Sequence, residues 1–143
     1  ALLALRAVMA SFKASNFRSK LDQMTESPQS IQTLSTYVCF FRKASKEVAQ
    51  VWAEEVRKAS AERHLCFIYL ANEIMQNSRR KGPELVQDLG AQLRHVMPEV
   101  FASAKESVRG KLLRILGIWE ERRVLDSNTI NELRDKMGGG GGG

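Results

Sequence analysis

Residues 69–84 read YLANEIMQNSRRKGPE. The apolar positions in this stretch recur at helical spacing and are so numerous that other helices should surround the segment. Asn72, Gln76 and either Arg79 or Arg80 follow at i, i+4 and i+7 or i+8, so in a helix they lie on one side. The three cations suit the end of a helix, and Gly-Pro stops it. The stretch therefore predicts an apolar helix that carries one polar stripe.

Glu73, Asn77 and Arg80 form a second polar row beside the first. Polar groups on so apolar a helix need hydrogen-bond partners. By pattern alone, a solvated face with cations at its end is the favoured interpretation. The alternative is a groove in which amide and carboxylate groups satisfy the backbone and hydroxyls of an extended peptide.

The rest of the chain also has helical periodicity, and its connections are short. About eight helices are predicted, and an all-α domain of successive helix pairs is more consistent with a right-handed superhelix than with a four-helix bundle. Ser30 is the predicted cap of the second helix, Pro98 the predicted start of the sixth and Ser127 the predicted cap of the last. The predicted helices cover about residues 16–24, 30–43, 45–58, 62–78, 83–96, 98–101, 107–122 and 127–137.

The composition restricts the class of partner without choosing it. The 143 residues suit one domain, and the formal net charge of +6 favours nucleic acid, anionic lipid or phosphorylated protein. The cations are scattered, with no arginine-rich helix, aromatic RNA-binding motif or zinc spacing, so RNA contact is expected to be secondary. No run of 18 apolar residues predicts a membrane span. Cys39 and Cys66 lie far apart in apolar segments and are predicted to be reduced thiols.

Catalytic chemistry has little support in the sequence. Neither His64 nor His95 has a partner at metal-ligand spacing. The adjacent pairs Glu54-Glu55 and Glu120-Glu121 point in different directions on a helix, so they do not form a two-carboxylate site. No glycine loop that could bind phosphate precedes a helix. The sequence therefore predicts a protein that is not an enzyme and that needs no cofactor or metal.

A second basic feature lies on the predicted helix 107–122. Lys111, Arg114 and Arg122 are interleaved with leucines, isoleucines and Trp119. Ordinary amphipathic solvation would explain this pattern. The sharper interpretation is a phosphate-binding site, because guanidinium groups meet phosphate with two charge-assisted hydrogen bonds.

Three segments together resemble the CTD-interacting domain, a module that binds the C-terminal tail of RNA polymerase II. They are residues 70–84, the stretch SIQTLS at 30–35 and the stretch LLRILGIWEER at 112–122. The nearest branch is similar to the yeast termination-factor and pre-mRNA-regulation proteins. The resemblance covers residues 9–137, which implies that residues 1–8 lie upstream of a natural start at Met9. Residues 138–143 would be a flexible glycine tail.

The resemblance implies an eight-helix right-handed superhelix related in shape to VHS and ENTH domains. It implies binding of the phosphorylated repeat Tyr-Ser-Pro-Thr-Ser-Pro-Ser in the largest polymerase subunit, a nuclear location, and a role in coupling transcription to termination or pre-mRNA 3′-end processing. No small-molecule substrate and no membrane contact are implied. The alternatives are a VHS/ENTH-type trafficking adaptor that binds lipid or cargo, and a general RNA-binding or scaffold protein.

The resemblance also implies which residues would contact the peptide. Asn72 and Glu73 match the family's Asn-Asp pair near the peptide tyrosine, with Glu in place of Asp. Asn77 and Arg80 match the next turn of the groove. The loop between the first two helices would touch the other end of the peptide through Ser27 and Gln29.

For the phosphate, the resemblance points to the predicted helix 107–122. Arg114 matches the arginine that meets the phosphate on the serine after tyrosine. Lys111 and Arg122 would support Arg114 electrostatically.

Overall fold

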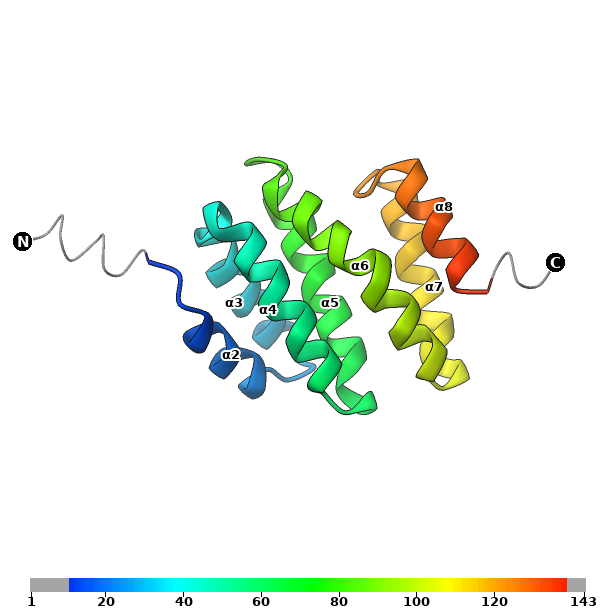
Figure 1. The fold of residues 1–143 in the computed structure, drawn as a ribbon, viewed down its shortest axis with the longest axis horizontal. Helices are drawn as coiled ribbons and strands as arrows, with labels where there is room; N and C mark the ends of the chain where they lie inside the picture. Colours follow the sequence, from blue (N-terminus) through cyan, green and yellow to red (C-terminus); the bar gives the residue numbers. More distant parts are fainter. Residues whose placement is uncertain (1–10, 139–143) are drawn as a thin grey trace, which may run out of the picture.

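The computed structural model describes residues 11–138, and every regular element in that range is helical. The predicted upstream residues 1–8 and the glycines 139–143 lie outside the described range. The described residues form seven α-helices, which Figure 1 labels, and a short 3-10 helix, η1, connects α3 to α4. The elements are α2 (Ala14–Gln23), α3 (Pro28–Phe40), η1 (Arg42–Ala44), α4 (Ser45–Lys58), α5 (Ala61–Ser78), α6 (Glu84–Ser103), α7 (Glu106–Glu121) and α8 (Ser127–Lys136).

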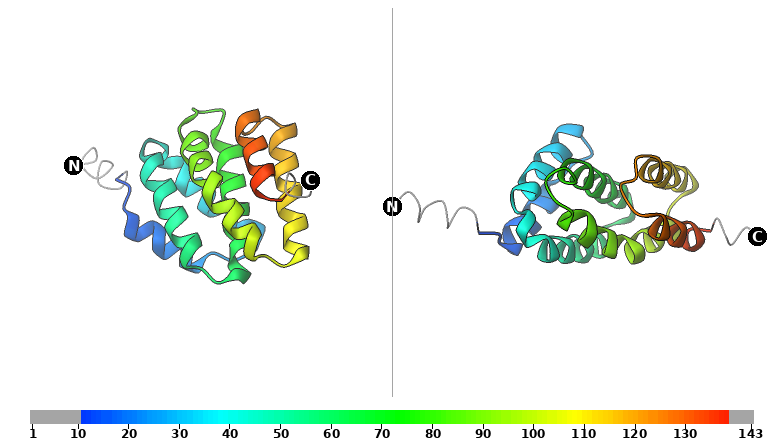
Figure 2. Two further views of the ribbon diagram at one scale, coloured as in Figure 1. Left: turned by 45° about the vertical axis from the view of Figure 1, so that its right-hand side comes forward. Right: turned by 90° about the horizontal axis from the view of Figure 1, so that it is seen from above.

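The helices form two layers. Seen from above in Figure 2, α3, α5 and α7 make one layer, and α2, α4, α6 and α8 make the other. Successive helices alternate between the layers, so α3, α5 and α7 run in the same direction and end at the same edge of the molecule (Figure 1). The predicted all-α superhelix is thereby confirmed.

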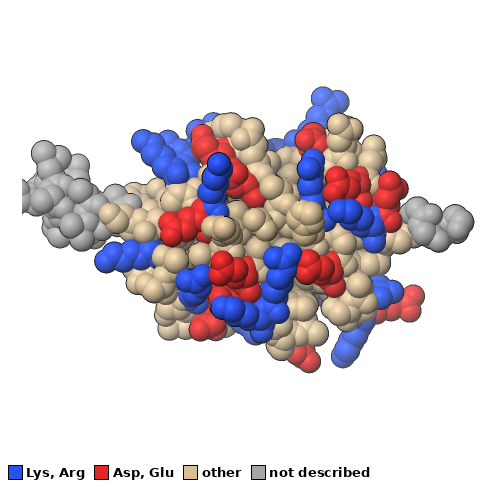
Figure 3. Space-filling view, in the orientation of Figure 1, with Lys and Arg blue, Asp and Glu red and all other residues tan. Residues whose placement is uncertain are grey.

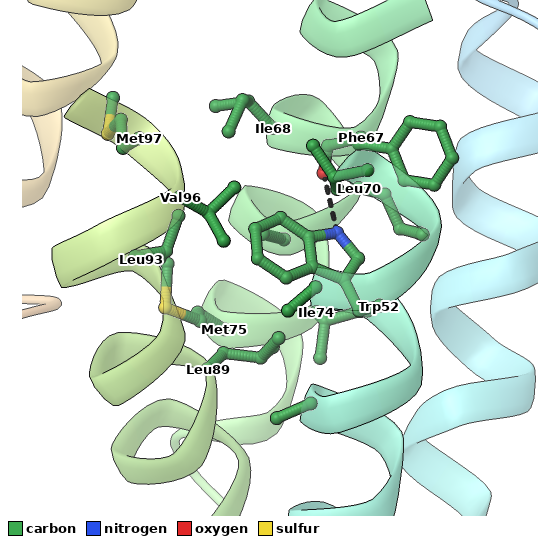
Figure 4. Close-up of a cluster of buried hydrophobic side chains, with 14 of the residues drawn as sticks. Trp52, Phe67, Ile68, Leu70, Ile74, Met75, Leu89, Leu93, Val96 and Met97 are labelled. Atoms are coloured by element: carbon green, nitrogen blue, oxygen red, sulfur yellow. Dashed lines mark hydrogen bonds between the residues drawn. The ribbon is translucent and has the colours of Figure 1, made fainter. Parts of the chain in front are cut away.

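The core lies between the two layers and is centred on Trp52 of α4. Its side chain is 0% exposed, and Nε1–H donates a 3.0 Å hydrogen bond to the carbonyl oxygen of Phe67 on α5 (Figure 4). Buried indole groups need such a partner for their N–H. Ile74, Leu89 and Val96 pack around the ring. Within the described residues, none of the helices is long and apolar enough to cross a lipid bilayer.

The predicted break at Pro98 is absent, which accounts for seven α-helices rather than about eight. Helix α6 continues through Pro98 to Ser103. A proline inside a helix leaves the carbonyl of the residue four positions earlier without its usual donor. Here Lys136 of α8 approaches that carbonyl, with Nζ 3.4 Å from the oxygen of Arg94. A tertiary contact that the sequence pattern does not reveal therefore compensates for the missing bond.

Two predicted helix caps were also wrong. Helix α3 begins at Pro28, and the Ser27 side chain, not Ser30, is its cap, because Ser27 Oγ accepts from the Ser30 backbone N–H at 3.1 Å. Ser30 Oγ instead accepts from the Thr25 backbone N–H at 3.0 Å. Helix α8 is capped by Asp126 and not by Ser127. The Thr129 backbone N–H donates a hydrogen bond to the Asp126 carboxyl group, and this bond lowers the pKa of Asp126.

Candidate peptide-binding groove

Helix α5 lies between α3 and α7 in one layer, and its predicted polar rows occupy the face between those two neighbours. Asn77 Nδ2 donates to Ser35 Oγ of α3 at 3.1 Å, which ties α5 to α3. Asn72 Oδ1 accepts from Trp119 Nε1 of α7 at 2.8 Å, which ties α5 to α7. Asn72 and Asn77, which the resemblance predicts to contact the peptide, thus both lie on α5, the helix that contacts α3 and α7. We define this face of α3, α5 and α7 as the groove.

The orientation of Asn72 follows from its partner. The indole N–H of Trp119 can only donate, so Asn72 must present its oxygen to it. The same oxygen accepts a second hydrogen bond from Gln76 Nε2 at 2.8 Å. Within residues 11–138, the side-chain nitrogen of Asn72, Nδ2, donates no hydrogen bond. Its two N–H groups are therefore available to donate to a ligand.

Gln76 connects this amide to the guanidinium group of Arg122, the C-terminal cap of α7. Its Nε2 donates to Asn72, while its Oε1 accepts from Arg122 Nη1 at 2.8 Å. Arg79 Nη1 in turn donates to the backbone oxygen of Arg122 at 2.8 Å. A continuous chain of hydrogen bonds therefore runs from buried Trp119 through Asn72 and Gln76 to Arg122.

The end of the groove is a cavity of about 460 Å³, which we call the arginine cavity. Its described lining contains no carboxylate, and the acceptors that its arginines use are neutral. Within the described residues, none of its three guanidinium groups forms an ion pair, so the cavity favours an anion. Phosphate fits best, because its oxygens can accept two hydrogen bonds from one guanidinium group. The lining residues are Gln76, Asn77, Arg79, Arg80 and Arg122.

Among these residues, Gln76 and Arg79 were not predicted site residues. The periodicity of residues 69–84 placed Arg79 or Arg80 on the polar stripe without choosing between them. The bond from Arg79 to the backbone oxygen of Arg122, just past α7, spans 43 positions in the chain, and no local pattern contains that information. Arg80, which was predicted, is exposed and makes no hydrogen bond within residues 11–138.

The three cations predicted to bind phosphate do not converge. Arg122 lines the arginine cavity. Lys111 lines a different and more apolar cavity of about 460 Å³ between α5 and α7, together with Leu65 and Tyr69. Arg114 is exposed and has no ion pair among the described residues. Charge is therefore distributed along α7 rather than gathered at one point.

Ser27 and Gln29 lie on another flank of α3. They line an open cavity of about 440 Å³ between α2 and α3, to which Lys20 contributes the cation. Ser27 Oγ already accepts the N-cap bond and a 3.1 Å bond from Thr25 Oγ1. The fold therefore uses Ser27 to begin α3, and any contact with a peptide would be additional.

Glu73 and the thiols occupy the remaining positions near the groove. Glu73 is partly buried and makes no ion pair within the described range. Burial raises the pKa of the Cys39 thiol, and the Glu73 carboxylate acts in the same direction. Burial likewise raises the pKa of Cys66. Both cysteines are free, as predicted. No three His, Cys, Asp or Glu side chains in residues 11–138 form a group that could hold a metal ion.

The family is now shown by comparison with known proteins. Residues 15–133 match the profile of the CID domain. The chain belongs to the CID family. The human protein named regulation of nuclear pre-mRNA domain-containing protein 1A is 38% identical over 131 residues, which is 92% of this chain and 42% of that protein. Human protein 1B of the same name is 40% identical over 129 residues, which is 90% of this chain and 40% of that protein.

A solved structure supports the same CID fold. The crystal structure of the RPR domain of Pcf11 superposes with a TM-score of 0.77 at 14% sequence identity, and the match covers 86% of this chain and 96% of that one. At this identity the likeness concerns the fold alone. The chain spans about two fifths of the length of the curated relatives it matches.

Proposed function

We propose that this CID domain binds the phosphorylated heptad-repeat tail of the largest RNA polymerase II subunit in the groove of α3, α5 and α7. The full-length protein would thereby connect transcription to termination or pre-mRNA 3′-end processing in the nucleus. The domain would act as a binding module rather than an enzyme. Membership of the CID family and the names of the relatives support the partner class.

The observation that carries the proposal is the position of Asn72 beside the arginine cavity. A proline-rich repeat has few internal hydrogen bonds and keeps its backbone carbonyls available. Asn72 Nδ2 offers two N–H groups to such carbonyls, because Trp119 and Gln76 already occupy its oxygen. One turn further along α5 the arginine cavity begins. A peptide lying on Asn72 could therefore place a phosphate within reach of the guanidinium groups.

Arg114 and Arg122 are two alternative binding positions for the phosphate. The resemblance assigns it to Arg114, whereas the cavity geometry favours Arg122 with Arg79 and Arg80 beside it. We propose that Arg122 contributes at least as much as Arg114, because it is held in place by Gln76 and faces a cavity without carboxylates. The apolar cavity beside Lys111 and Tyr69 would accept an apolar ring of the same peptide.

Fluorescence anisotropy with a two-repeat tail peptide tests the proposal at physiological salt. The peptide would be unmodified, phosphorylated on the serine after tyrosine, or phosphorylated on the later serine. Loss of a charge-assisted hydrogen bond costs about 1.5–3 kcal/mol, so Arg122→Ala should weaken the preferred phosphopeptide about ten- to a hundredfold and the unmodified peptide much less. Arg114→Ala, measured in parallel, shows how the phosphate contact is divided.

Arg57→Ala is the matched control, because Arg57 pairs with Glu99 between α4 and α6, away from the groove. It should leave all three affinities unchanged. Equal losses for phosphorylated and unmodified peptides would show that neither arginine reads the phosphate. No binding to any of the peptides would reject the proposal, and binding to phosphoinositide vesicles instead would favour the trafficking-adaptor alternative.

A further inference from the structure

One corner of the molecule carries unpaired cations around an exposed aromatic ring. Phe40, the last residue of α3, is 67% exposed, the larger of the two exposed fractions among the large exposed hydrophobic side chains of residues 11–138. Arg42 and Lys43 follow at once in η1, and Lys46 lies in the first turn of α4. Lys81 follows the end of α5, which is bonded to α3 through Asn77 and Ser35 and ends at the same edge of the molecule (Figure 1). We call these five residues the basic corner.

Within residues 11–138, the cations of the basic corner differ from the six cations that form ion pairs. Within residues 11–138, the ion pairs lie elsewhere, on the α2, α4, α6 and α8 side and at the end of α7. None of the four cations of the basic corner takes part in one. The carboxylates of Glu47 and Glu73 are nearby, but no ion pair forms with them. The cations of the described residues that do form ion pairs are Arg18, Arg57, Lys58, Arg94, Arg134 and Lys136.

Cations suit the C-terminal end of a helix, and the helix dipole alone would account for part of this cluster. It does not account for Phe40, because leaving an aromatic ring two-thirds exposed gives up the burial that usually stabilises such a side chain. The neighbouring Phe41 is buried against Phe12 and Tyr37. The ring of Phe40 meets Phe41 edge-on at 5.1 Å, so Phe41 supports it from the side. Figure 3 shows Lys and Arg side chains, with Asp and Glu side chains beside them, along the upper edge of the molecule.

We propose that the basic corner binds single-stranded nucleic acid, with Phe40 stacking on an unpaired base and the surrounding cations contacting the phosphates. Sequence-tolerant binding of single strands combines these two elements, a stacking platform and positive charge along the backbone. A duplex offers phosphates but keeps its bases stacked, so it cannot use the ring. This surface uses no residue assigned to the tail peptide, and the inference therefore stands independently of the proposed function.

The test is fluorescence anisotropy with a labelled 12-nucleotide poly-U RNA, its DNA equivalent and a 12-base-pair RNA duplex, over a series of salt concentrations. Phe40→Ala should weaken binding to the single strands about five- to a hundredfold, and Phe40→Trp should retain it. The double variant Lys43→Gln with Lys46→Gln should reduce the slope of log K against log salt by about 1.4, which is about 0.7 for each phosphate contact.

Lys105→Gln is the matched charge control, because Lys105 is exposed and precedes α7 at the opposite edge of the layer. Unchanged binding in this variant, with loss in Phe40→Ala, supports the proposal. Equal affinities for the RNA and the DNA strand would show that the domain does not distinguish the sugar. A higher affinity for the RNA strand would identify RNA as the natural ligand. The proposal is overturned if the wild-type domain binds neither strand, if the duplex binds as tightly, or if Lys105→Gln weakens binding as much. Phosphopeptide affinity that falls equally in Phe40→Ala would assign the corner to the peptide instead.

Discussion

Trp52 and Trp119 are both fully buried, and both satisfy their indole N–H, yet they serve different parts of the domain. Trp52 donates to a backbone carbonyl of α5 in the middle of the core. Trp119 donates to the side chain of Asn72 at the edge of the groove. A backbone partner stays in place whatever the side chain is, whereas a side-chain partner is oriented by the bond. Packing of α7 against α5 therefore sets the orientation of the Asn72 amide, whereas packing of α4 against α5 stabilises the core.

The largest expected effect concerns stability. Trp52→Ala removes a fully buried indole from the centre of the core and should lower the free energy of unfolding by about 3–5 kcal/mol. Urea denaturation followed by circular dichroism measures this loss. A loss below about 1 kcal/mol would mean that the core around Trp52 can collapse into the space, contrary to the dense packing described.

The second prediction separates the two tryptophans by function. Trp119→Phe removes the donor to Asn72, which can then rotate its amide, and a neutral hydrogen bond is worth about 0.5–1.5 kcal/mol. The affinity for the unmodified tail peptide and the affinity for the phosphorylated one should both fall about three- to tenfold. Trp52→Phe is the matched variant and should leave affinity unchanged at a temperature where it is folded. Equal binding losses in both variants would contradict the distinction between the two sites.

The smallest effect sharpens the link from Asn72 to the arginine cavity. Gln76→Glu keeps an acceptor for Arg122 but adds a negative charge to the cavity, at a partly exposed position. Preference for the phosphorylated over the unmodified peptide should fall about two- to fivefold, the range of an exposed charge pair. Gln76→Met removes both side-chain hydrogen bonds of Gln76 without adding a charge and should preserve the preference. A phosphate preference that is unchanged by Gln76→Glu would place the phosphate away from this cavity.

Local pattern was enough to predict the helical class, the polar rows of α5 and the cations at its end, whereas the groove was implied by the resemblance. Periodicity identifies which residues share a face, and Asn72 and Asn77 do face the groove. It does not identify what meets them: the Trp119–Asn72 bond joins positions 47 apart, and the Asn77–Ser35 bond joins positions 42 apart. The same limit explains why Lys111 in α7 and Arg122 at the C-terminal cap of α7 line separate cavities.

The wrong predictions have tertiary causes as well. Proline statistics favour a helix start at Pro98, and they do not include Lys136 of α8 near the Arg94 carbonyl. Ser30 fits an N-cap by type, but Ser27 is the residue with the extended backbone that a cap requires.

The position of Trp119 has an optical consequence. The chain contains two tryptophans, and both indoles are shielded from water in the free domain. Only Trp119 is hydrogen-bonded to a group that would itself bond a ligand. Its emission should therefore change when the groove is occupied, while Trp52 contributes a constant background. The domain thus carries an intrinsic reporter, and titrations could follow occupancy of the groove with unlabelled peptides.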